Sequence, residues 1–267
     1  MRKVVLMSRR KVSGLRTILT GASAGIGRCL ACELSRQGAR LVLTARRQEA
    51  LEDLQRQIRD AGGEAHVVAG DVVDAGLRQR LLDTAAAQLG GLDLLINNAG
   101  VGAIGHFAEA SEQRLRRVME VNFFAPVELI RAAIPLLQAG QRPMIVNVSS
   151  VLGHRGIPKK SEYCASKFAL HGLSDSIRCE LASVGIDVLV VSPGTTATEF
   201  FDNVLEKTAD LPWLALGAMS AESVARKTVK AIRRGRHEII LTPGGKLLVW
   251  CDRLCPPLVN RLVARFG

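Results

Sequence analysis

Short apolar runs of strand length alternate with longer amphipathic stretches along most of this chain, and the alternation constrains its fold more than any other feature. The runs at residues 41–43 and 188–191 are apolar at every position, as strands covered on both faces require. The pattern predicts strands near residues 16–20, 39–45, 64–70, 92–97, 143–149, 186–192 and 237–241, with helices between them. We therefore expect an α/β fold: a single doubly wound, Rossmann-type domain whose seven-stranded, mostly parallel sheet is flanked by helices.

Length and composition suit one domain. The 267 residues are 48% apolar and 23% charged, enough to bury one large core without disulfides or a metal. No linker rich in proline and serine and no internal repeat divides the sequence. We expect a basic N-terminal segment over residues 1–14, the α/β domain over 15–243 and an amphipathic C-terminal extension over 244–267.

Positive charge is concentrated near the ends of the chain. The formal net charge is +11, and residues 1–16 carry six basic and no acidic side chains. Residues 226–237 carry six more basic side chains, and residues 245–267 carry four against Asp252. Residues 17–225, by contrast, hold 20 basic and 23 acidic side chains. With one tyrosine and no interleaving of basic and aromatic residues, the sequence predicts charged termini and no nucleic-acid partner.

The N-terminal residues and the cysteines both indicate a cytoplasmic protein. Between the charges of residues 1–16 only residues 4–7 form an apolar run, which is too short for a signal peptide or a membrane span. The six cysteines have no metal-binding spacing, and a reducing compartment leaves them as thiols. Cys29 and Cys32 match the C-x-x-C pattern of a thioredoxin-like site, but inside a predicted helix they are better explained as small packing groups.

A glycine-rich segment follows the first predicted strand. Residues 20–27 read TGASAGIG and lead into a helix, with the spacing G-x-x-x-G-x-G rather than the more familiar G-x-G-x-x-G. Glycines let the backbone approach a pyrophosphate, which the amides and dipole at a helix N-terminus stabilise. By itself the segment leaves two interpretations open: a nucleotide-binding loop, or three glycines that serve only a turn.

The end of the second predicted strand indicates which dinucleotide fits. An NAD-selective protein places an acidic residue here to bind the ribose 2′-hydroxyl, whereas this chain has Ala45, Arg46 and Arg47. Two guanidinium groups suit a dianionic 2′-phosphate, which favours NADP over NAD. The alternative is a solvated arginine pair at the start of the next helix.

A tyrosine and a lysine follow the fifth predicted strand. Tyr163 and Lys167 are four residues apart, so in a helix their side chains are neighbours. A phenol, whose ordinary pKa is about 10, exchanges protons near neutrality only if its anion is stabilised, and a lysine ammonium does this. Tyr163 is the only tyrosine in the chain, which makes its place beside this lysine informative.

Taken together, these motifs resemble the short-chain dehydrogenase/reductase (SDR) family. The match runs from about Thr17 to Thr198, with the motifs in the family's order. They are the TGASAGIG loop, Asp71, Asn97-Asn98-Ala99-Gly100, Asn122, Ser150, Tyr163, Lys167, and Pro193-Gly194 leading to Thr198. The resemblance implies an oxidoreductase that transfers hydride between a nicotinamide cofactor and a carbonyl or alcohol.

The resemblance also implies a role for each catalytic residue. Tyr163 is the general acid/base, and Ser150, thirteen residues before it, hydrogen-bonds the oxygen of the carbonyl or alcohol. Lys167 binds the nicotinamide ribose and lowers the pKa of Tyr163, while Asn122 holds a water in the proton relay. Ser149 is expected to be structural.

The same resemblance implies a cofactor site, for which we expect NADP. Its residues are Gly21, Ser23, Gly25, Ile26, Gly27, Arg46, Arg47, Asp71, Val72, Asn98, Ala99, Gly100, Tyr163, Lys167, Pro193, Gly194, Thr196 and Thr198. Ala24 stands where the family's NADP-binding loops carry a basic residue, so the NADP preference depends on the two arginines. Structural alternatives stay open for Asp71 as a helix cap and for Asn97 and Asn98 as ties between strands.

The segment over residues 199–219 predicts the substrate class. In the family this region forms a substrate lid, and here it is apolar and includes Trp213. An apolar lid indicates a small apolar ketone, aldehyde or alcohol as the substrate. The alternative is that these side chains serve only packing.

The histidines give no sequence signal of a metal site. His106, His154 and His171 lack an H-x-x-x-H spacing, so we expect them to be ordinary polar or packing residues and we expect no metal.

The last residues form an amphipathic pattern with a cationic face. Leu258, Val259, Leu262 and Val263 recur at helical spacing between basic residues. We expect this helix to pack over the cleft or against a partner subunit in a homodimer or homotetramer. The alternative is peripheral contact with an anionic membrane, helped by the basic N-terminus. A nucleotide-sensing or membrane-associated protein with little activity is the alternative to an enzyme.

Overall fold

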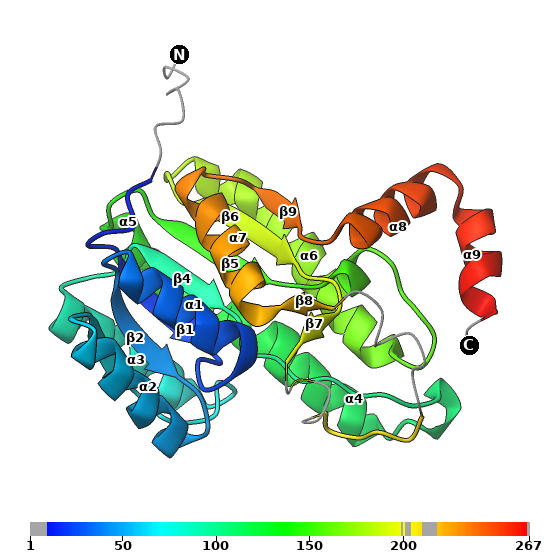
Figure 1. The fold of residues 1–267 in the computed structure, drawn as a ribbon, viewed down its shortest axis with the longest axis horizontal. Coiled ribbons are helices and arrows are strands. Elements are labelled where there is room, and N and C mark those ends of the chain that lie inside the picture. Colours follow the sequence, from blue (N-terminus) through cyan, green and yellow to red (C-terminus); the bar gives the residue numbers. More distant parts are fainter. Residues whose placement is uncertain (1–9, 199, 201–203, 210–217, 266–267) are drawn as a thin grey trace, which may run out of the picture.

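A seven-stranded parallel sheet lies at the centre of the molecule, with the strand order β3-β2-β1-β4-β5-β6-β9 (Figure 1). The computed structural model describes residues 10–198, 200, 204–209 and 218–265. The strands are β1 (Arg16–Thr20), β2 (Arg40–Thr44), β3 (Glu64–Val67), β4 (Leu94–Asn97), β5 (Met144–Val148), β6 (Asp187–Ser192) and β9 (Glu238–Ile240). Each overlaps one of the strands expected from the apolar runs, and the pairings of this sheet are parallel, so the predicted fold class is confirmed.

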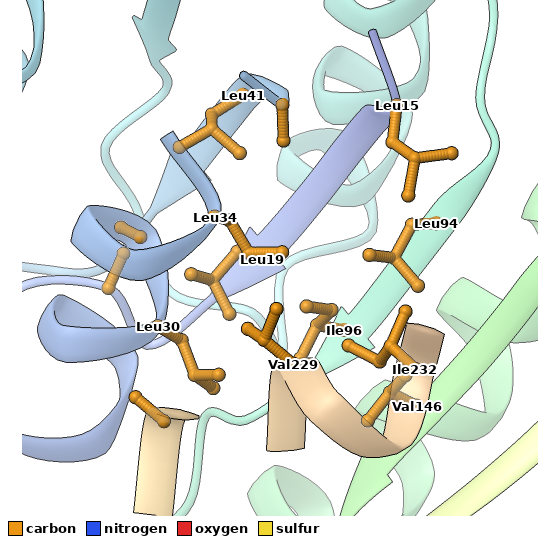
Figure 2. Packing of buried hydrophobic residues seen from close by; sticks show 14 of the residues in the cluster. Leu15, Leu19, Leu30, Leu34, Leu41, Leu94, Ile96, Val146, Val229 and Ile232 are labelled. Atoms are coloured by element: carbon orange, nitrogen blue, oxygen red, sulfur yellow. The ribbon is translucent and has the colours of Figure 1, made fainter. Parts of the chain in front are cut away.

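Helices cover both faces of the sheet. An apolar cluster on one face includes side chains of α1 (Gly25–Arg36), α2 (Gln48–Asp60) and α7 (Ala221–Arg233). Figure 2 shows Leu30 of α1 and Val229 of α7 packing toward Leu19 and Ile96 of the sheet. A second cluster lies on the other face and includes side chains of α3 (Ala75–Thr84), α5 (Ala125–Gln138) and α6 (Ser161–Ala182). The α6 helix is thereby held against the sheet by its buried Leu181.

The other described elements lie around the carboxyl ends of the strands or extend from the domain. They are α4 (Glu112–Met119), the paired short strands β7 (Thr196–Ala197) and β8 (Met219–Ser220), π-helical segments at Ala85–Leu89 and Glu120–Phe124, 3-10 turns at Phe107–Glu109 and Val151–Gly153, α8 (Pro243–Leu254) and α9 (Pro256–Ala264). Proline at the start of α8 and of α9 suits the first turn of a helix, where its missing amide proton has no acceptor to lose.

The strand order fixes where a ligand binds. Strand β1 lies between β2 and β4, so the chain builds the sheet outward in both directions from this point. In doubly wound sheets the connections that leave such neighbouring strands run to opposite faces and open a crevice at the carboxyl ends. The crevice is expected between the loops that follow β1 and β4.

The C-terminal extension consists of two helices, α8 and α9, that project from the domain (Figure 1). Val249 and Val259 are buried, but most of the large apolar side chains are exposed: Leu247, Trp250, Leu254, Leu258 and Leu262. The sequence predicted amphipathic character here, and the structure places that apolar row in solvent. No helix in the described part of the chain combines the length and the apolar character needed to cross a bilayer.

Candidate active site

A cleft of about 850 Å³ opens at the carboxyl ends of the sheet strands. Its wall includes the residues that follow β1, β2, β4, β5 and β6. The residues predicted for the site from the sequence line this cleft, with the exception of Asn122. The strand order and the motifs therefore identify the same place.

The glycine-rich loop joins β1 to α1 at one end of the cleft. Gly21 has a φ of +69°, and a Cβ added at Gly27 would lie 2.0 Å from the carbonyl oxygen of Gly21. These glycines are therefore required by the turn itself. Ala24 caps α1 without any side-chain hydrogen bond, which leaves the first amides of this helix without a side-chain acceptor where they border the cleft. The turn and an anion-binding helix end are thus present together, and they fit a pyrophosphate.

Two arginines line the cleft just beyond the end of β2. Arg46 and Arg47 both border it, and Arg47 donates to Ser23 Oγ at 3.4 Å and to the Ser23 carbonyl oxygen at 3.3 Å. Arg47 therefore contacts the glycine loop and is not simply a solvated surface group. No acidic residue stands at the end of β2. The guanidinium groups occupy the place where a dinucleotide 2′-phosphate is expected.

Asp71 lies on the cleft wall and does not cap a helix. The N-cap of α3 is Asp74, whose side chain accepts from the amides of Gly76 and Leu77. Asp71 instead forms an ion pair with Arg117 of α4. Burial opposes ionisation of Asp71, but the hydrogen bond from Arg117, the hydrogen bond from the Val73 amide and the charges of the nearby arginines together lower the pKa of the carboxyl. The helix-cap interpretation of Asp71 is wrong.

Asn97 and Asn98 brace the strand ends in different ways. Asn97 Nδ2 donates to Asn147 Oδ1 at 2.9 Å, which ties β4 to β5. Asn98 Nδ2 donates to the carbonyl oxygens of Thr20 and Gly21 at 3.0 and 3.1 Å, and Asn98 also lines the cleft. The strand-tying interpretation holds for both residues, and Asn98 additionally borders the site.

Helix α6 brings Tyr163 and Lys167 to one face, as the four-residue spacing predicted. Lys167 Nζ lies 5.7 Å from the centre of the Tyr163 ring and donates to the Val148 carbonyl oxygen at 3.0 Å. Lys167 is buried, and this burial lowers its pKa to about 8. Burial also raises the pKa of Tyr163, while a hydrogen bond with Ser150 opposes the rise. In the protein alone, Ser150 is thus the group that favours the phenolate.

The two serines after β5 have separate places. Ser150 Oγ lies at the cleft and accepts from the Leu152 amide at 3.1 Å, so the 3-10 turn fixes its position. Ser149 is buried and its hydroxyl donates to the Lys167 carbonyl oxygen at 3.4 Å. Ser149 therefore ties the end of β5 to α6, which agrees with the structural role predicted for it.

The buried side chain of Asn122 does not line the cleft and forms hydrogen bonds to other groups of the protein. It lies in the π-helical segment Glu120–Phe124, and its Oδ1 accepts from the Val101 amide at 2.8 Å. Its Nδ2 donates to the Val101 carbonyl oxygen and to Ser166 Oγ, both at 2.9 Å. Ser166 in turn donates to the Tyr163 carbonyl oxygen at 2.7 Å. The side chain of Asn122 thus steadies the first turn of α6, and its predicted role in holding a water stays a prediction.

Comparisons with known proteins agree with this geometry. A sequence profile of the family described as short chain dehydrogenase matches residues 16–209. The chain belongs to the short-chain dehydrogenase family. A ketoacyl reductase, HetN, from Nostoc is 31% identical over 96% of this chain and 90% of its own length. Hydroxysteroid 11-beta-dehydrogenase 1-like protein A from Xenopus laevis is 35% identical over 97% of this chain and 89% of its own length.

Solved short-chain dehydrogenases share the fold and differ in cofactor. One from Burkholderia phymatum, in complex with NAD, has a TM-score of 0.85 at 27% identity and covers 93% of this chain and 96% of that chain. One from Burkholderia cenocepacia, in complex with NADP, has a TM-score of 0.79 at 26% identity over 89% of this chain and 100% of that chain. Membership of this family makes the chain a dehydrogenase or reductase that binds a nicotinamide cofactor.

The described part of residues 199–219, the predicted lid, lies against the loop that follows β4. The Leu205 amide donates to the Gly102 carbonyl oxygen at 2.8 Å, and the Ile104 amide donates to the Glu206 carbonyl oxygen at 2.9 Å. Phe200 lies 5.7 Å from the Tyr163 ring, and Met219 borders the cleft. Trp213 and the rest of residues 210–217 lie outside the described residues.

Several cleft residues of this short-chain dehydrogenase carried no motif signal. Arg117 is one of them, because its pairing with Asp71 spans 46 residues of sequence. Lys160 is another: it is buried at the start of α6, and burial lowers its pKa to about 8. Leu248 of α8 also borders the cleft. No described residue of α9, the helix predicted to pack over the cleft or a partner subunit, lines the cleft, and that prediction stays a prediction.

The C-x-x-C pair lies in the interior of α1. Burial, followed by the nearby Glu222 carboxylate, raises the pKa of Cys29 to about 11, and burial also raises the pKa of Cys32. A redox-active pair needs a lowered thiol pKa. The packing interpretation fits Cys29, which packs against an apolar cluster, whereas Cys32 is exposed, and the raised pKa values of both thiols do not support the thioredoxin-like interpretation.

Two of the three predicted packing histidines meet in space. The rings of His154 and His171 lie 4.4 Å apart, edge to face, although the residues are seventeen positions apart. Burial, with smaller contributions from His171 and Arg253, lowers the pKa of His154 to about 4. His106 is exposed. Spacing along the sequence did not predict this contact.

Proposed function

We propose that this protein is an NADP(H)-dependent oxidoreductase that interconverts an apolar ketone or aldehyde and its alcohol. The observation that carries the proposal is the placement of Ser150, Tyr163 and Lys167 on the wall of one cleft that also contains the glycine loop and two arginines. A proton donor, an oxygen-binding hydroxyl and a dinucleotide cradle in one cleft are the parts that carbonyl reduction needs.

The bound cofactor supplies or accepts the hydride at the substrate carbon. In the reducing direction Ser150 Oγ and the Tyr163 hydroxyl bind the carbonyl oxygen, and Tyr163 donates its proton to that oxygen. The hydrogen bond with Ser150 favours the phenolate that remains. Lys167, whose lowered pKa of about 8 still leaves it charged near neutrality, adds a positive charge 5.7 Å from the ring. Asn122 and Ser166 hold the first turn of α6, and with it Tyr163, in place.

The preference for NADP rests on Arg46 and Arg47. Both line the cleft beyond β2, where no acidic residue is present to bind a ribose 2′-hydroxyl. A 2′-phosphate would repel such an acid and pairs instead with guanidinium groups. Because solved relatives bind NAD in one case and NADP in another, the argument depends on these side chains alone.

An apolar substrate is supported by the rest of the cleft wall. The cleft that holds Tyr163 is also lined by apolar side chains: Val151, Leu152, Ile157, Phe200, Met219 and Leu248. Relatives named as a ketoacyl reductase and as a hydroxysteroid dehydrogenase-like protein suit the same broad class of apolar carbonyl compounds. We therefore propose apolar carbonyl compounds and their alcohols as the substrate class.

The test is consumption of NADPH with a panel of carbonyl compounds graded in apolar size, compared with NADH at equal concentration. The proposal predicts turnover that rises with apolar size and that requires NADPH. Cofactor binding without turnover of any member of the panel favours a nucleotide-sensing protein instead.

We also propose a cytoplasmic protein that self-associates as a homodimer or homotetramer through the C-terminal extension. The exposed apolar row on α8 and α9 supports an association surface. Arg253 and Arg261 in the same helices make peripheral contact with an anionic membrane the alternative. Size measurement in solution and sedimentation with anionic vesicles separate the two.

A further inference from the structure

A cluster of imidazole and carboxylate groups lies outside the cleft. His154 follows the turn Val151–Gly153, His171 lies on α6, and Glu238 begins the edge strand β9. One side-chain donor atom of each lies within 4.8 Å of the others. None of the three lines the cleft, so they are not part of the proposed catalytic site.

The separations suit a small tetrahedral ion. With bonds of about 2.0–2.1 Å to zinc, two ligands of a tetrahedral ion lie about 3.4 Å apart. His154 Nε2 and Glu238 Oε1 are already 3.3 Å apart, and His171 Nε2 lies 4.0 Å from the same carboxylate oxygen. His171 and the partly exposed Glu238 have to approach each other by a fraction of an ångström, and the donor atoms of the two histidines lie within 4.8 Å of each other.

The imidazole of His171 has no hydrogen bond to hold it. Its side chain is 13% exposed, and its buried Nδ1 has no partner in the described part of the protein. Its Nε2 faces Asp175 at 3.8 Å and Glu238 at 4.0 Å, both beyond hydrogen-bond distance. An ion between the imidazoles and the carboxylates would bind Nε2 and hold the ring, whereas Nδ1 would stay without a partner among the described residues.

The charges around the cluster favour a cation. Two carboxylates, Asp175 and Glu238, face the imidazoles. Asp175 Oδ1 accepts from Arg178 at 2.6 Å, which leaves Oδ2 on the side of His171. Arg253 of α8 is the cation that acts on His154. His154 Nε2 also lies 2.9 Å from Ser192 Oγ, whose hydroxyl would become a neighbour of the bound ion.

We propose that His154, His171 and Glu238 form a binding site for zinc, which fastens α6 to β9 and to the loop after Ser150. Imidazole and carboxylate ligands from three separate elements are a donor set that zinc accepts, with a water or Asp175 as the fourth ligand. Sequence spacing gave no sign of the site because its ligands are separated by seventeen and sixty-seven residues.

The test is metal binding by the full chain after removal of metal with a chelator. Zinc is measured by competition with a chromophoric chelator, and Co²⁺ is used as a spectroscopic substitute whose visible bands report tetrahedral geometry. The variants are Glu238→Gln and His171→Gln. The matched control is His237→Gln, which removes an exposed neighbouring imidazole. Circular dichroism checks that each variant is folded.

The proposal predicts one zinc per chain for the wild type and for the control, and a higher melting temperature when zinc is present. Because losing an outer partner of a metal site already costs 10–100-fold in affinity, each ligand variant is expected to lose at least about tenfold. Equal binding by the ligand variants and the wild type, loss of binding in the control, or a cobalt spectrum with thiolate bands from the cysteines would overturn it.

Discussion

Replacing Arg114 with methionine tests the buried ion pair that adjoins Tyr163. Arg114 of α4 and Glu162 of α6 have side chains that are 2% and 3% exposed. Nε and Nη2 of Arg114 donate to Glu162 Oε1 at 2.9 and 2.6 Å. Because Glu162 directly precedes Tyr163, the pair fixes the start of α6 against α4. The substitution leaves a buried carboxylate without its partner.

The expected loss of stability in Arg114→Met is large for a single substitution. Removing one member of a buried ion pair typically costs about 3–5 kcal/mol. At about 2.1 cal/mol/K per residue, the entropy of unfolding for a chain of 267 residues is about 0.56 kcal/mol/K, so the melting temperature should fall by about 5–9 °C.

The assay is thermal and urea unfolding of the wild type, the single variants Arg114→Met and Glu162→Leu, and the double variant Arg114→Met/Glu162→Leu. Replacing both partners by apolar groups removes the buried charge, so the double variant should recover more than half of the loss. A single variant within about 1 kcal/mol of the wild type would show that the pair is not effectively buried. A double variant as unstable as the sum of the two single changes would show that packing and not charge is responsible.

The contribution of Glu162 to the free energy of unfolding should change with pH in opposite directions in the wild type and in Arg114→Met. Burial opposes ionisation of Glu162, but the hydrogen bond and charge of Arg114, a backbone hydrogen bond and the Ser161 hydroxyl together lower its pKa, so its contribution to stability is present above the unfolded-state pKa and is lost as the pH falls through the folded value. Without Arg114, burial is opposed only by the backbone hydrogen bond and Ser161, so the pKa of Glu162 rises and protonation relieves the destabilisation. The difference in stability between the two proteins should therefore narrow as the pH falls.

Three further predictions concern the cofactor, the lysine and the C-terminal extension. Arg46→Ala should weaken NADPH binding by roughly 1–3 kcal/mol, the usual effect of losing a charged hydrogen bond, and leave NADH binding nearly unchanged in a fluorescence titration; a wild type that prefers NADH would contradict the argument from the missing acid. The pKa of Lys167 near 8 predicts that kcat/KM for NADPH-dependent reduction falls as the pH rises through about that value and the ammonium is lost, and a pH profile without that step contradicts it. Deleting residues 245–267 should abolish self-association without changing sedimentation with anionic vesicles, whereas lost vesicle binding with an unchanged oligomeric state would support the membrane alternative.

Local pattern was enough to predict the sheet. Continuous apolar runs placed the strands because a strand buried on both faces tolerates few polar residues. Most site residues came from the family resemblance of the motifs, and several of them, including Asn98, Ser150 and Gly194, follow strands whose carboxyl ends meet at one edge. The four-residue spacing of Tyr163 and Lys167 needed only helix geometry.

Contacts between segments that are distant in the sequence could not be predicted from the sequence. The ion pair of Arg117 with Asp71 and that of Arg114 with Glu162 join residues 46 and 48 positions apart. No periodicity encodes such pairs, since they depend on how α4 lies against the cleft and α6. The contacts of Asn122 are of the same kind: the family resemblance implied that it holds a water, whereas its bonds to Val101 and to Ser166 of α6 depend on how the π-helical segment lies in the fold.

The most direct test of the proposed chemistry is the turnover of Tyr163→Phe with NADPH and an apolar carbonyl compound that the wild type reduces. The substitution keeps the ring beside Phe200 and removes only the hydroxyl that meets Ser150. We predict that turnover is abolished while the NADPH dissociation constant stays nearly unchanged. Turnover within about tenfold of the wild type, a barrier change of no more than about 1.4 kcal/mol, would contradict the assignment of Tyr163 as the general acid/base.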